Sequence, residues 1–431
     1  MSPRRISLRE WQTCLVPDVV LSTRDRALAR ELGDGSAGRL VVEELREGVR
    51  IRSSSWIGVV RFEQLEVRVE PKLAGDSLRV VEMVEVTRGL ETLRRNSAVR
   101  TLHAGGADLF DLFASLLADE CERLVKGGLL HGYVEEEDEL PAARGRILWD
   151  RQVLRRPGRV ERLACRFDEL RQDVVENRLL AAALAFCSRR VRHEGVARRT
   201  RELEALFREL CDPEALSSTE VAGIVYDRLN AHYREAHALA KLLLAGQGTE
   251  DLLATGDWRC FAFLIDMNAL FERLMEVVLR FVLGGQGLQV HAQQRNRSIL
   301  WDVTRQRPYA PVIPDFVVEP KEGTGLRITV DAKYKTYDDR QLASSDVYQG
   351  FLYAFAYAST VEMPRALVVH PSESPSGSHR RLLVRTGTAA ASGAFLDVVG
   401  VYIPALLEEL RSRKRGAHAR SLANRVLQAH L

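Results

Sequence analysis

Two aspartates and a lysine in the C-terminal third of the chain have the types and spacing needed to hydrolyse a phosphodiester bond. Asp315 follows a proline, and after 15 intervening residues the chain continues Asp331, Ala332, Lys333. Magnesium suits this chemistry because it takes one or two carboxylates, keeps several waters and leaves room for phosphate oxygens. We therefore predict Asp315 and Asp331 as ligands of magnesium, or of manganese, joined by the Ala332 carbonyl. Lys333 is predicted to orient the attacking water and to offset developing negative charge.

A β-hairpin is the element expected to position these groups. Residues 314–319 and 326–333 are apolar and β-prone, and the residues between them, 322–325, favour a turn. Side chains two apart on a strand share a face, and an antiparallel partner lies opposite. The pattern therefore predicts that Asp315 lies across the ladder from Asp331, close enough for both carboxylates to bind one ion.

The order of these residues resembles the PD-(D/E)xK nuclease superfamily. Downstream, Gln349 and Tyr353 are spaced to share one face of a helix, which resembles the Q-x-x-x-Y element of RecB-like nucleases. Upstream, Glu272 stands in an amphipathic helix predicted to carry Phe263 through Val278, and it matches the glutamate that many members supply near the metal. The resemblance implies a site that includes Glu272, Gln349 and Tyr353.

Hydrophobic periodicity predicts an α/β multidomain protein. Residues 1–100 are predicted to form a β-rich N-terminal module, and alternation at residues 65–70 indicates a half-exposed sheet or barrel. Residues 101–255 are predicted to be a mostly helical middle domain. The superfamily resemblance implies that residues 256–431 form a PD-(D/E)xK restriction-endonuclease-like α/β domain. The acidic run at residues 135–139 is expected to be a solvated loop.

Composition excludes several classes of protein. The net charge is +3, so a nucleic-acid surface must come from local clustering. The six cysteines are scattered singly, which argues against zinc and disulfides and favours buried thiols in a reducing compartment. The N-terminus lacks the apolar stretch of a signal peptide, and no stretch of the chain is long enough for a membrane helix. We expect a cytoplasmic protein that does not bind a membrane.

The resemblance extends along nearly the whole chain to the McrC family, the nuclease subunit of McrBC-type modification-dependent restriction systems. The matching stretches are residues 56–62 and 65–73, Arg144-Gly145-Arg146-Ile147, Asn177-Arg178-Leu179-Leu180, residues 263–272, Pro314-Asp315 and Asp331-Ala332-Lys333. The resemblance implies a magnesium-dependent DNA endonuclease that works with a McrB-like AAA+ GTPase hexamer and stimulates its GTPase. The N-terminal module and the middle region are the parts expected to dock on that partner.

Two other functions remain open. The chain could be a RecB-like nuclease that acts alone or with a helicase in DNA repair or phage defence. It could also be a nuclease-fold scaffold without catalysis that binds a motor or DNA, although intact Asp315, Asp331 and Lys333 argue against this. No G-x-x-x-x-G-K-[ST] pattern occurs in the sequence. We therefore expect no nucleotide hydrolysis by the chain itself.

Overall fold

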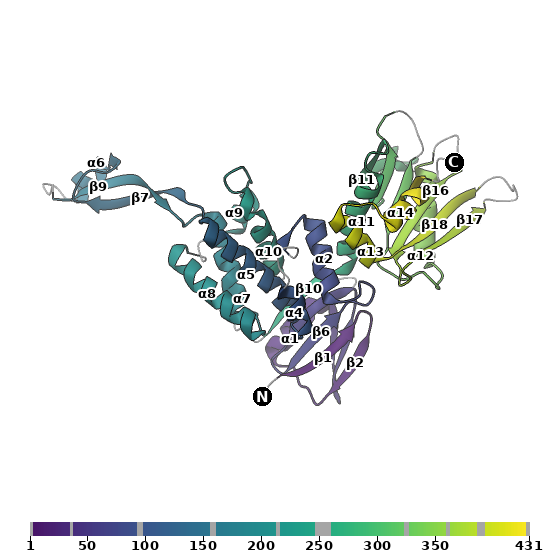
Figure 1. Ribbon diagram of the computed structural model, residues 1–431, viewed down its shortest axis with the longest axis horizontal. Coiled ribbons are helices and arrows are strands. Elements are labelled where there is room, and N and C mark those ends of the chain that lie inside the picture. Colours follow the sequence, from purple (N-terminus) through teal and green to yellow (C-terminus); the bar gives the residue numbers. More distant parts are fainter. Residues whose placement is uncertain are drawn as a thin grey trace. The chain divides into compact units, whose positions relative to one another are not determined.

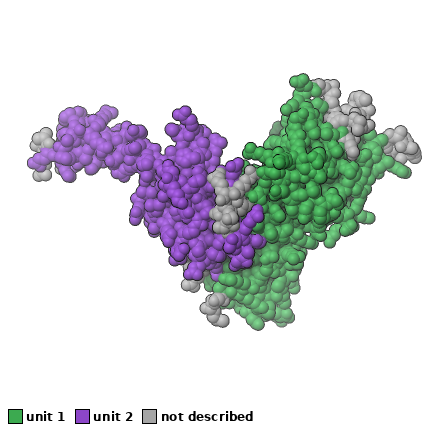
Figure 2. All heavy atoms as spheres, in the orientation of Figure 1, with its two compact units in different colours: residues 1–90, 259–431 green, residues 91–258 purple. Residues whose placement is uncertain are grey.

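The chain forms two compact units, residues 1–90 with 259–431 (unit 1) and residues 91–258 (unit 2) (Figure 2). The computed structural model describes residues 3–34, 38–92, 98–155, 161–212, 216–245, 260–322, 327–358, 363–385 and 393–427. The fold is mixed α/β with several sheets, as predicted. The division into three domains by residue number stays a prediction. No helix in the described ranges is long and apolar enough to cross a membrane.

The N-terminal part of unit 1 contains two small sheets, ordered β1-β6-β5-β10 and β2-β4-β3. Its elements are β1 (Arg4–Arg9), β2 (Thr13–Pro17), α1 (Thr23–Gly33), β3 (Leu40–Leu45), β4 (Gly48–Ser53), β5 (Trp56–Arg61), β6 (Leu65–Glu70) and α2 (Ser77–Arg88). The alternation at residues 65–70 corresponds to β6, and the N-terminal part contains several strands, as predicted. The fourth strand of the first sheet, β10 (Phe261–Asp266), comes from the C-terminal part of the chain and pairs antiparallel with β5.

The expectation that one face of β6 is exposed to solvent is wrong at Glu66. Glu66 is fully buried, because Arg61 and Arg68 place their Nε atoms 3.2 and 3.0 Å from its carboxylate oxygens. Alternation alone cannot distinguish a solvated polar face from one covered by paired charges.

The long helix predicted from Phe263 to Val278 also begins later than expected. Phe261, Phe263 and Ile265 are buried alternately on β10, and α11 runs over Met267–Leu283. Asp266 ends the strand and caps the helix by accepting the backbone N–H of Asn268.

The C-terminal part of unit 1 is built on a six-stranded mixed sheet, ordered β11-β14-β15-β16-β18-β17. Helix α12 packs against β15, β16 and β18, whereas α11 and α14 contact each other and the sheet (Figure 1). The elements are α11, β11 (Leu288–Ala292), β12 (Asn296–Asp302), β13 (Arg307–Val312), β14 (Phe316–Pro320), β15 (Ile328–Ala332), α12 (Ser344–Ala356), β16 (Arg365–Pro371), β17 (Ser378–Arg385), β18 (Gly393–Val401), α13 (Ile403–Ser412) and α14 (Ala417–Leu427).

Unit 2 combines a helical part with a three-stranded sheet, ordered β7-β9-β8. The predicted helices are present, but the acidic run at residues 135–139 is a strand and not a loop. Glutamates of β7 face arginines of β9: Arg166 lies 2.6 Å from Glu137, and Arg171 lies 2.7 Å from Glu136. These cross-strand pairs offset the repulsion that the sequence alone suggests.

The elements of unit 2 are α4 (Ala98–Ala104), α5 (Leu109–Gly127), β7 (Gly132–Leu140), β8 (Arg146–Ile147), α6 (Trp149–Arg155), β9 (Leu163–Arg171), α7 (Val175–Arg190), α8 (Glu194–Leu210), α9 (Ser218–Gly223), a 3-10 turn (Ala231–Tyr233) and α10 (Arg234–Leu244). Four of the six cysteines are buried, as expected, whereas Cys14 and Cys260 are half-buried.

A buried ion cluster holds β16, β17 and β18 together at one side of the large sheet. Asp397 is fully buried and pairs with Arg365, with Arg381 at 2.8 Å and with His379 at 2.9 Å. Burial acts to raise the pKa of Asp397, but these partners more than offset it and hold the pKa below its usual value. The carboxylate is therefore ionised in the folded protein.

Removing Asp397 should destabilise unit 1. We expect Asp397→Ala to lower the free energy of unfolding by about 3–5 kcal/mol, because it leaves buried arginine charge without a partner. Because the pKa is depressed on folding, this contribution is present above the unfolded pKa and is lost as the pH falls through the folded value. Denaturant unfolding should detect both effects. The exposed Asp339→Ala variant is the control and should change stability by less than about 0.5 kcal/mol.

Candidate functional site

Strand pairing brings the two predicted aspartates together, as the hairpin pattern predicts. Strands β14 and β15 are antiparallel, and Phe316 pairs with Val330, so Asp315, one residue before β14, lies beside Asp331 near the end of β15. The backbone N–H of Ala332 donates to Oδ2 of Asp315 at 2.8 Å. This bond fixes the Asp315 carboxylate at the edge of the sheet. The predicted turn at residues 322–325 lies largely outside the described residues.

The second carboxylate is buried and incompletely satisfied. Asp331 is 2% exposed, and Nζ of Lys333 lies 2.8 Å from its Oδ2. This contact is an ion pair and not a well-directed hydrogen bond. Among the described residues, neither oxygen of Asp331 accepts a hydrogen bond of good geometry. Buried carboxylate oxygens rarely lack such hydrogen bonds, so Asp331 is a candidate for binding a cation or for taking part in chemistry.

The electrostatics of the Asp315 and Asp331 carboxylates favour a positive charge beside them. Burial raises the pKa of Asp315 to about 7, and the neighbouring charges of Asp331 and Glu272 act in the same direction. Burial would lower the pKa of Lys333, but the carboxylates around it, first that of Asp331, more than offset this and raise its pKa. Lys333 therefore stays a cation near neutral pH and is not a proton acceptor there.

Helix α12 places Gln349 and Tyr353 next to the aspartates, in agreement with the i, i+4 prediction. Nε2 of Gln349 donates to the Tyr353 hydroxyl at 2.9 Å, and that hydroxyl donates to the Ile313 carbonyl at 3.0 Å. Burial raises the pKa of Tyr353, and the charges of Asp315 and Asp331 add to the effect. The two side chains thus fix the backbone that precedes Asp315, and among the described residues no hydrogen bond joins them to the Asp315 or Asp331 carboxylate.

Glu272 reaches the site from α11 through a residue that the sequence did not single out. Its Oε1 accepts a hydrogen bond from Nε2 of Gln293 at 2.6 Å, and the Gln293 backbone N–H donates to the Asp315 carbonyl at 2.8 Å. Gln293 has φ 47°, in the left-handed region. It ties the helix carrying Glu272 to the segment carrying Asp315, and no motif around it could have indicated this.

A further carboxylate, which sequence reasoning missed, lies near Lys333. Asp346, at the start of α12, is buried and accepts hydrogen bonds from the Tyr337 hydroxyl and, at 3.2 Å, from Nζ of Lys335. Burial would raise its pKa, but these bonds and the charge of Lys333 lower it overall. Asp346 is therefore ionised and helps to hold the Lys333 ammonium in its charged form.

Comparison with known proteins places this site in a family. The sequence matches the family described as "McrBC 5-methylcytosine restriction system component" over residues 51–371, about three quarters of the chain, including Asp315, Asp331 and Lys333. The chain belongs to the McrBC family. The resemblance to McrBC-type restriction systems that the sequence indicated is therefore confirmed for the family. No protein among the curated proteins matches the sequence.

The fold resembles that of a chain in a solved structure from Thermococcus gammatolerans. That chain is part of the refined half-complex from the tetradecameric assembly of McrB AAA+ hexamers with bound McrC. It is 20% identical, with a TM-score of 0.64, and the match covers 99% of this chain and 100% of that chain. A chain of the McrBC complex from the same organism is 21% identical, with a TM-score of 0.49, and the match covers 65% of this chain and 88% of that one.

Two carboxylates, those of Asp315 and Asp331, are the candidate metal ligands of the predicted site. Within the described ranges, no three His, Cys, Asp or Glu side chains converge closely enough to form a metal cluster. Magnesium does not need such a cluster, because one or two carboxylates and several waters complete its shell. The partly satisfied Asp331, the raised pKa of Asp315 and the absence of soft ligands fit a hard divalent cation.

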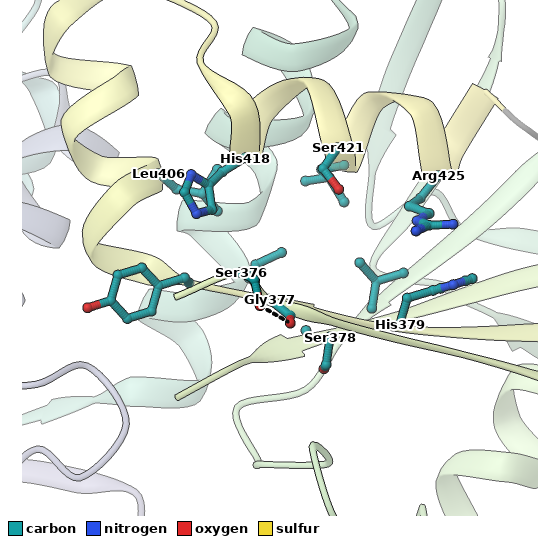
Figure 3. A pocket seen from close by; sticks show the side chains of 13 residues that line it. Ser376, Gly377, Ser378, His379, Leu406, His418, Ser421 and Arg425 are labelled. Atoms are coloured by element: carbon teal, nitrogen blue, oxygen red, sulfur yellow. Dashed lines mark hydrogen bonds between the residues drawn. The ribbon is translucent and has the colours of Figure 1, made fainter. Parts of the chain in front are cut away.

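A cavity of about 170 Å³ elsewhere in unit 1 does not include these residues. It lies between β17, β18, α13 and α14, and His379, His418, Ser378, Ser421 and Arg425 are among its lining side chains (Figure 3). The histidines already have partners: His379 contacts Asp397, and His418 contacts Glu409 and the Pro375 carbonyl. We assign no chemistry to this cavity.

Proposed function

We propose that this chain is the DNA endonuclease subunit of a McrBC-type restriction system and cleaves foreign DNA by metal-dependent phosphodiester hydrolysis. The observation that carries the proposal is the buried Asp331 carboxylate, with no well-directed hydrogen bond, beside Asp315 and Lys333. Family membership supports it. An inert scaffold has no need of a buried carboxylate whose oxygens lack well-directed hydrogen bonds, since such a group costs stability.

Each residue of the site has a role in this proposal. Asp315, Asp331 and the Ala332 carbonyl would hold magnesium, or manganese, which when bound activates water and stabilises charge on phosphate oxygens. Lys333, kept protonated by its acidic neighbours, orients the water and offsets charge that develops on the phosphate. Glu272 adds negative charge near the two carboxylates that would hold the metal. Gln349 and Tyr353 hold the backbone before Asp315 in position.

Metal dependence tests this function directly. We expect magnesium or manganese to support cleavage of plasmid DNA, and calcium to bind without supporting it well, because the site offers two carboxylates and no thiolate or histidine cluster. Excess EDTA should stop cleavage, and added magnesium should restore it. Full activity in excess EDTA would exclude the mechanism.

The motor activity of such a system must come from another subunit. The solved relative was determined with McrB AAA+ hexamers, and the present sequence has no Walker-type phosphate-binding loop. We therefore propose a McrB-like AAA+ GTPase hexamer as partner. Cleavage by the isolated chain, without any motor, would instead favour a RecB-like nuclease.

Docking on the proposed AAA+ partner is better tested with point substitutions than with a deletion. Strand β5 pairs with β10, and the Tyr334 hydroxyl donates to the buried Glu10, so deleting residues 1–100 would disrupt the fold of unit 1. Large exposed apolar side chains offer better probes of both predicted docking parts: Trp11 and Val20 in the N-terminal part, and Tyr133 and Trp149 in unit 2.

The isolated chain should not hydrolyse GTP, and it should stimulate GTP hydrolysis by the separate AAA+ subunit. We expect Trp11→Asn with Val20→Asp, or Tyr133→Asp with Trp149→Asp, to abolish co-purification and stimulation, because exposed apolar side chains anchor interfaces. Asp331→Ala should keep both activities. GTP hydrolysis by the chain alone, or normal stimulation by both double variants, would contradict the proposed docking.

A further inference from the structure

A narrow hairpin stands next to the candidate site and belongs to no larger sheet among the described residues. It consists of β12 and β13, which pair only with each other in that part of the chain. Three of its large apolar side chains lie in solvent: Trp301 is 49% exposed, Val303 72% and Tyr309 76%. Exposed apolar side chains that gather in one place, unlike single ones, indicate an interaction surface.

The hairpin is also basic. Residues 293–312 contain four arginines, at positions 295, 297, 305 and 307, all of them exposed, against one acidic residue, Asp302. Arg305 lies 3.9 Å from Asp302, but no described carboxylate lies within ion-pair distance of Arg295, Arg297 or Arg307. This differs from the β7–β9 ribbon, where arginines face glutamates across the strands. The charge of the β12–β13 hairpin is therefore available to a ligand.

Both ends of the hairpin are fixed to the candidate site. Before β12, the Gln293 backbone N–H donates to the Asp315 carbonyl, and after β13 the chain reaches Asp315 within three residues. Ile299 and Leu300 of β12 pack against the cluster that contains Val312 of β13 and Tyr353 of α12. The inner side chains thus anchor the hairpin on the helix beside the aspartates, while the arginines face solvent.

We propose that the β12–β13 hairpin binds the DNA duplex beside the bond that is cleaved, with Arg295, Arg297 and Arg307 on backbone phosphates. The inference rests on the proposed function, which makes DNA the substrate. A strand of seven residues spans roughly 20 Å, and a two-stranded ribbon fits the major groove. Trp301 and Tyr309 supply apolar surface against sugars or bases, and unpaired arginines supply the charge that a phosphate backbone attracts.

Duplex binding by the full-length chain tests the inference. The probe is a fluorescein-labelled duplex of about three helical turns, in calcium to prevent cleavage, followed by anisotropy between about 50 and 200 mM salt. The test variant is Arg295→Gln with Arg297→Gln and Arg307→Gln. The matched control is Arg30→Gln with Arg46→Gln and Arg52→Gln, which removes the same charge from exposed positions elsewhere in unit 1.

The hairpin variant should bind the duplex at least about ten-fold more weakly than wild type, and the slope of log K against log salt should decrease by about two to three, since about 0.9 is lost per phosphate contact. The control should keep both values. As an independent reading, DNA should change the emission of Trp301, and Trp301→Phe should remove that change without altering the fold.

Three results would overturn the inference. Equal losses in the hairpin variant and the control would mean that only overall charge matters. A wild-type chain that does not bind the duplex would exclude the hairpin as a DNA contact, while metal-dependent cleavage with the partner would still uphold the proposed function. A hairpin variant that keeps its affinity for DNA but loses stimulation of the AAA+ GTPase would assign the surface to an acidic protein.

Discussion

Asp315→Ala, Asp331→Ala and Lys333→Ala should each reduce DNA cleavage by about 10³-fold or more while the chain stays folded. All three side chains act on one transition state, two by holding the cation and one by offsetting charge on the phosphate. Their losses should therefore not add: the double variant Asp315→Ala with Lys333→Ala should be about as inactive as either single variant. Plasmid cleavage with the proposed AAA+ partner, magnesium and GTP measures the effect.

Two controls separate catalysis from folding. Asp339→Ala removes an exposed carboxylate eight residues beyond Asp331 and should cleave normally. The three site variants should keep the circular dichroism spectrum of wild type and should still stimulate the GTPase of the partner. A folded Asp331→Ala protein that still cleaves DNA would exclude the site, and so would a double variant as active as wild type.

The two central residues of the site could be predicted from the sequence because they lie close together in the chain, on one hairpin. A hairpin with period-two alternation determines which side chains meet, so Asp315 and Asp331 could be placed side by side from spacing alone. The i, i+4 spacing likewise placed Gln349 and Tyr353 on one face of α12, and the two side chains are hydrogen-bonded.

Contacts between distant segments could not be predicted in the same way. Strand β10 pairs with β5 although about 200 residues separate them, and this pairing joins the N-terminal sheet to the C-terminal part of unit 1. Gln293 contacts Glu272 across 21 positions, and its left-handed backbone has no sequence signature. The acidic strand β7 looked like a loop because its neutralising arginines lie on another strand.

The basic segment near the C-terminus gives a similar lesson. Residues 411–415 contain three arginines and a lysine, whose partners the sequence alone does not indicate. In the structure, Arg411 lies 2.8 Å from the buried Glu82 of α2, and Arg415 donates to the Gly284 carbonyl. Basic side chains that are clustered in the sequence can thus join elements of the fold. Their role depends on partners far away in the chain.

The raised pKa of Asp315 leads to a second large effect, on stability as well as activity. Asp315→Asn should abolish cleavage and, without metal, should make unit 1 more stable than wild type at pH 8. Burial and the neighbouring Asp331 raise the pKa from 3.8 to about 7, so the folded state binds a proton more tightly than the unfolded state does. Wild-type stability therefore falls as the pH rises from about 4 to about 7, whereas the uncharged asparagine does not incur this loss.

Thermal unfolding in EDTA at several pH values measures this difference. Above pH 7 the melting temperature of Asp315→Asn should exceed that of wild type by several degrees, since about 1 kcal/mol shifts a domain of this size by about 2–4 °C. Near pH 4 both proteins carry an uncharged group at position 315, and the two melting temperatures should converge. A variant less stable than wild type at pH 8 would contradict the raised pKa.

Magnesium should reverse the order of the two proteins at pH 8. A cation that binds only the folded state stabilises it by an amount that grows with the ratio of its concentration to its dissociation constant, and at low pH it must displace the proton held by Asp315. We therefore expect magnesium to raise the melting temperature of wild type and to leave that of Asp315→Asn nearly unchanged. The magnesium concentration needed for a given rise of the wild-type melting temperature should increase as the pH falls below 7, because the proton then competes with the cation. An equal magnesium response in both proteins would place the ion away from Asp315.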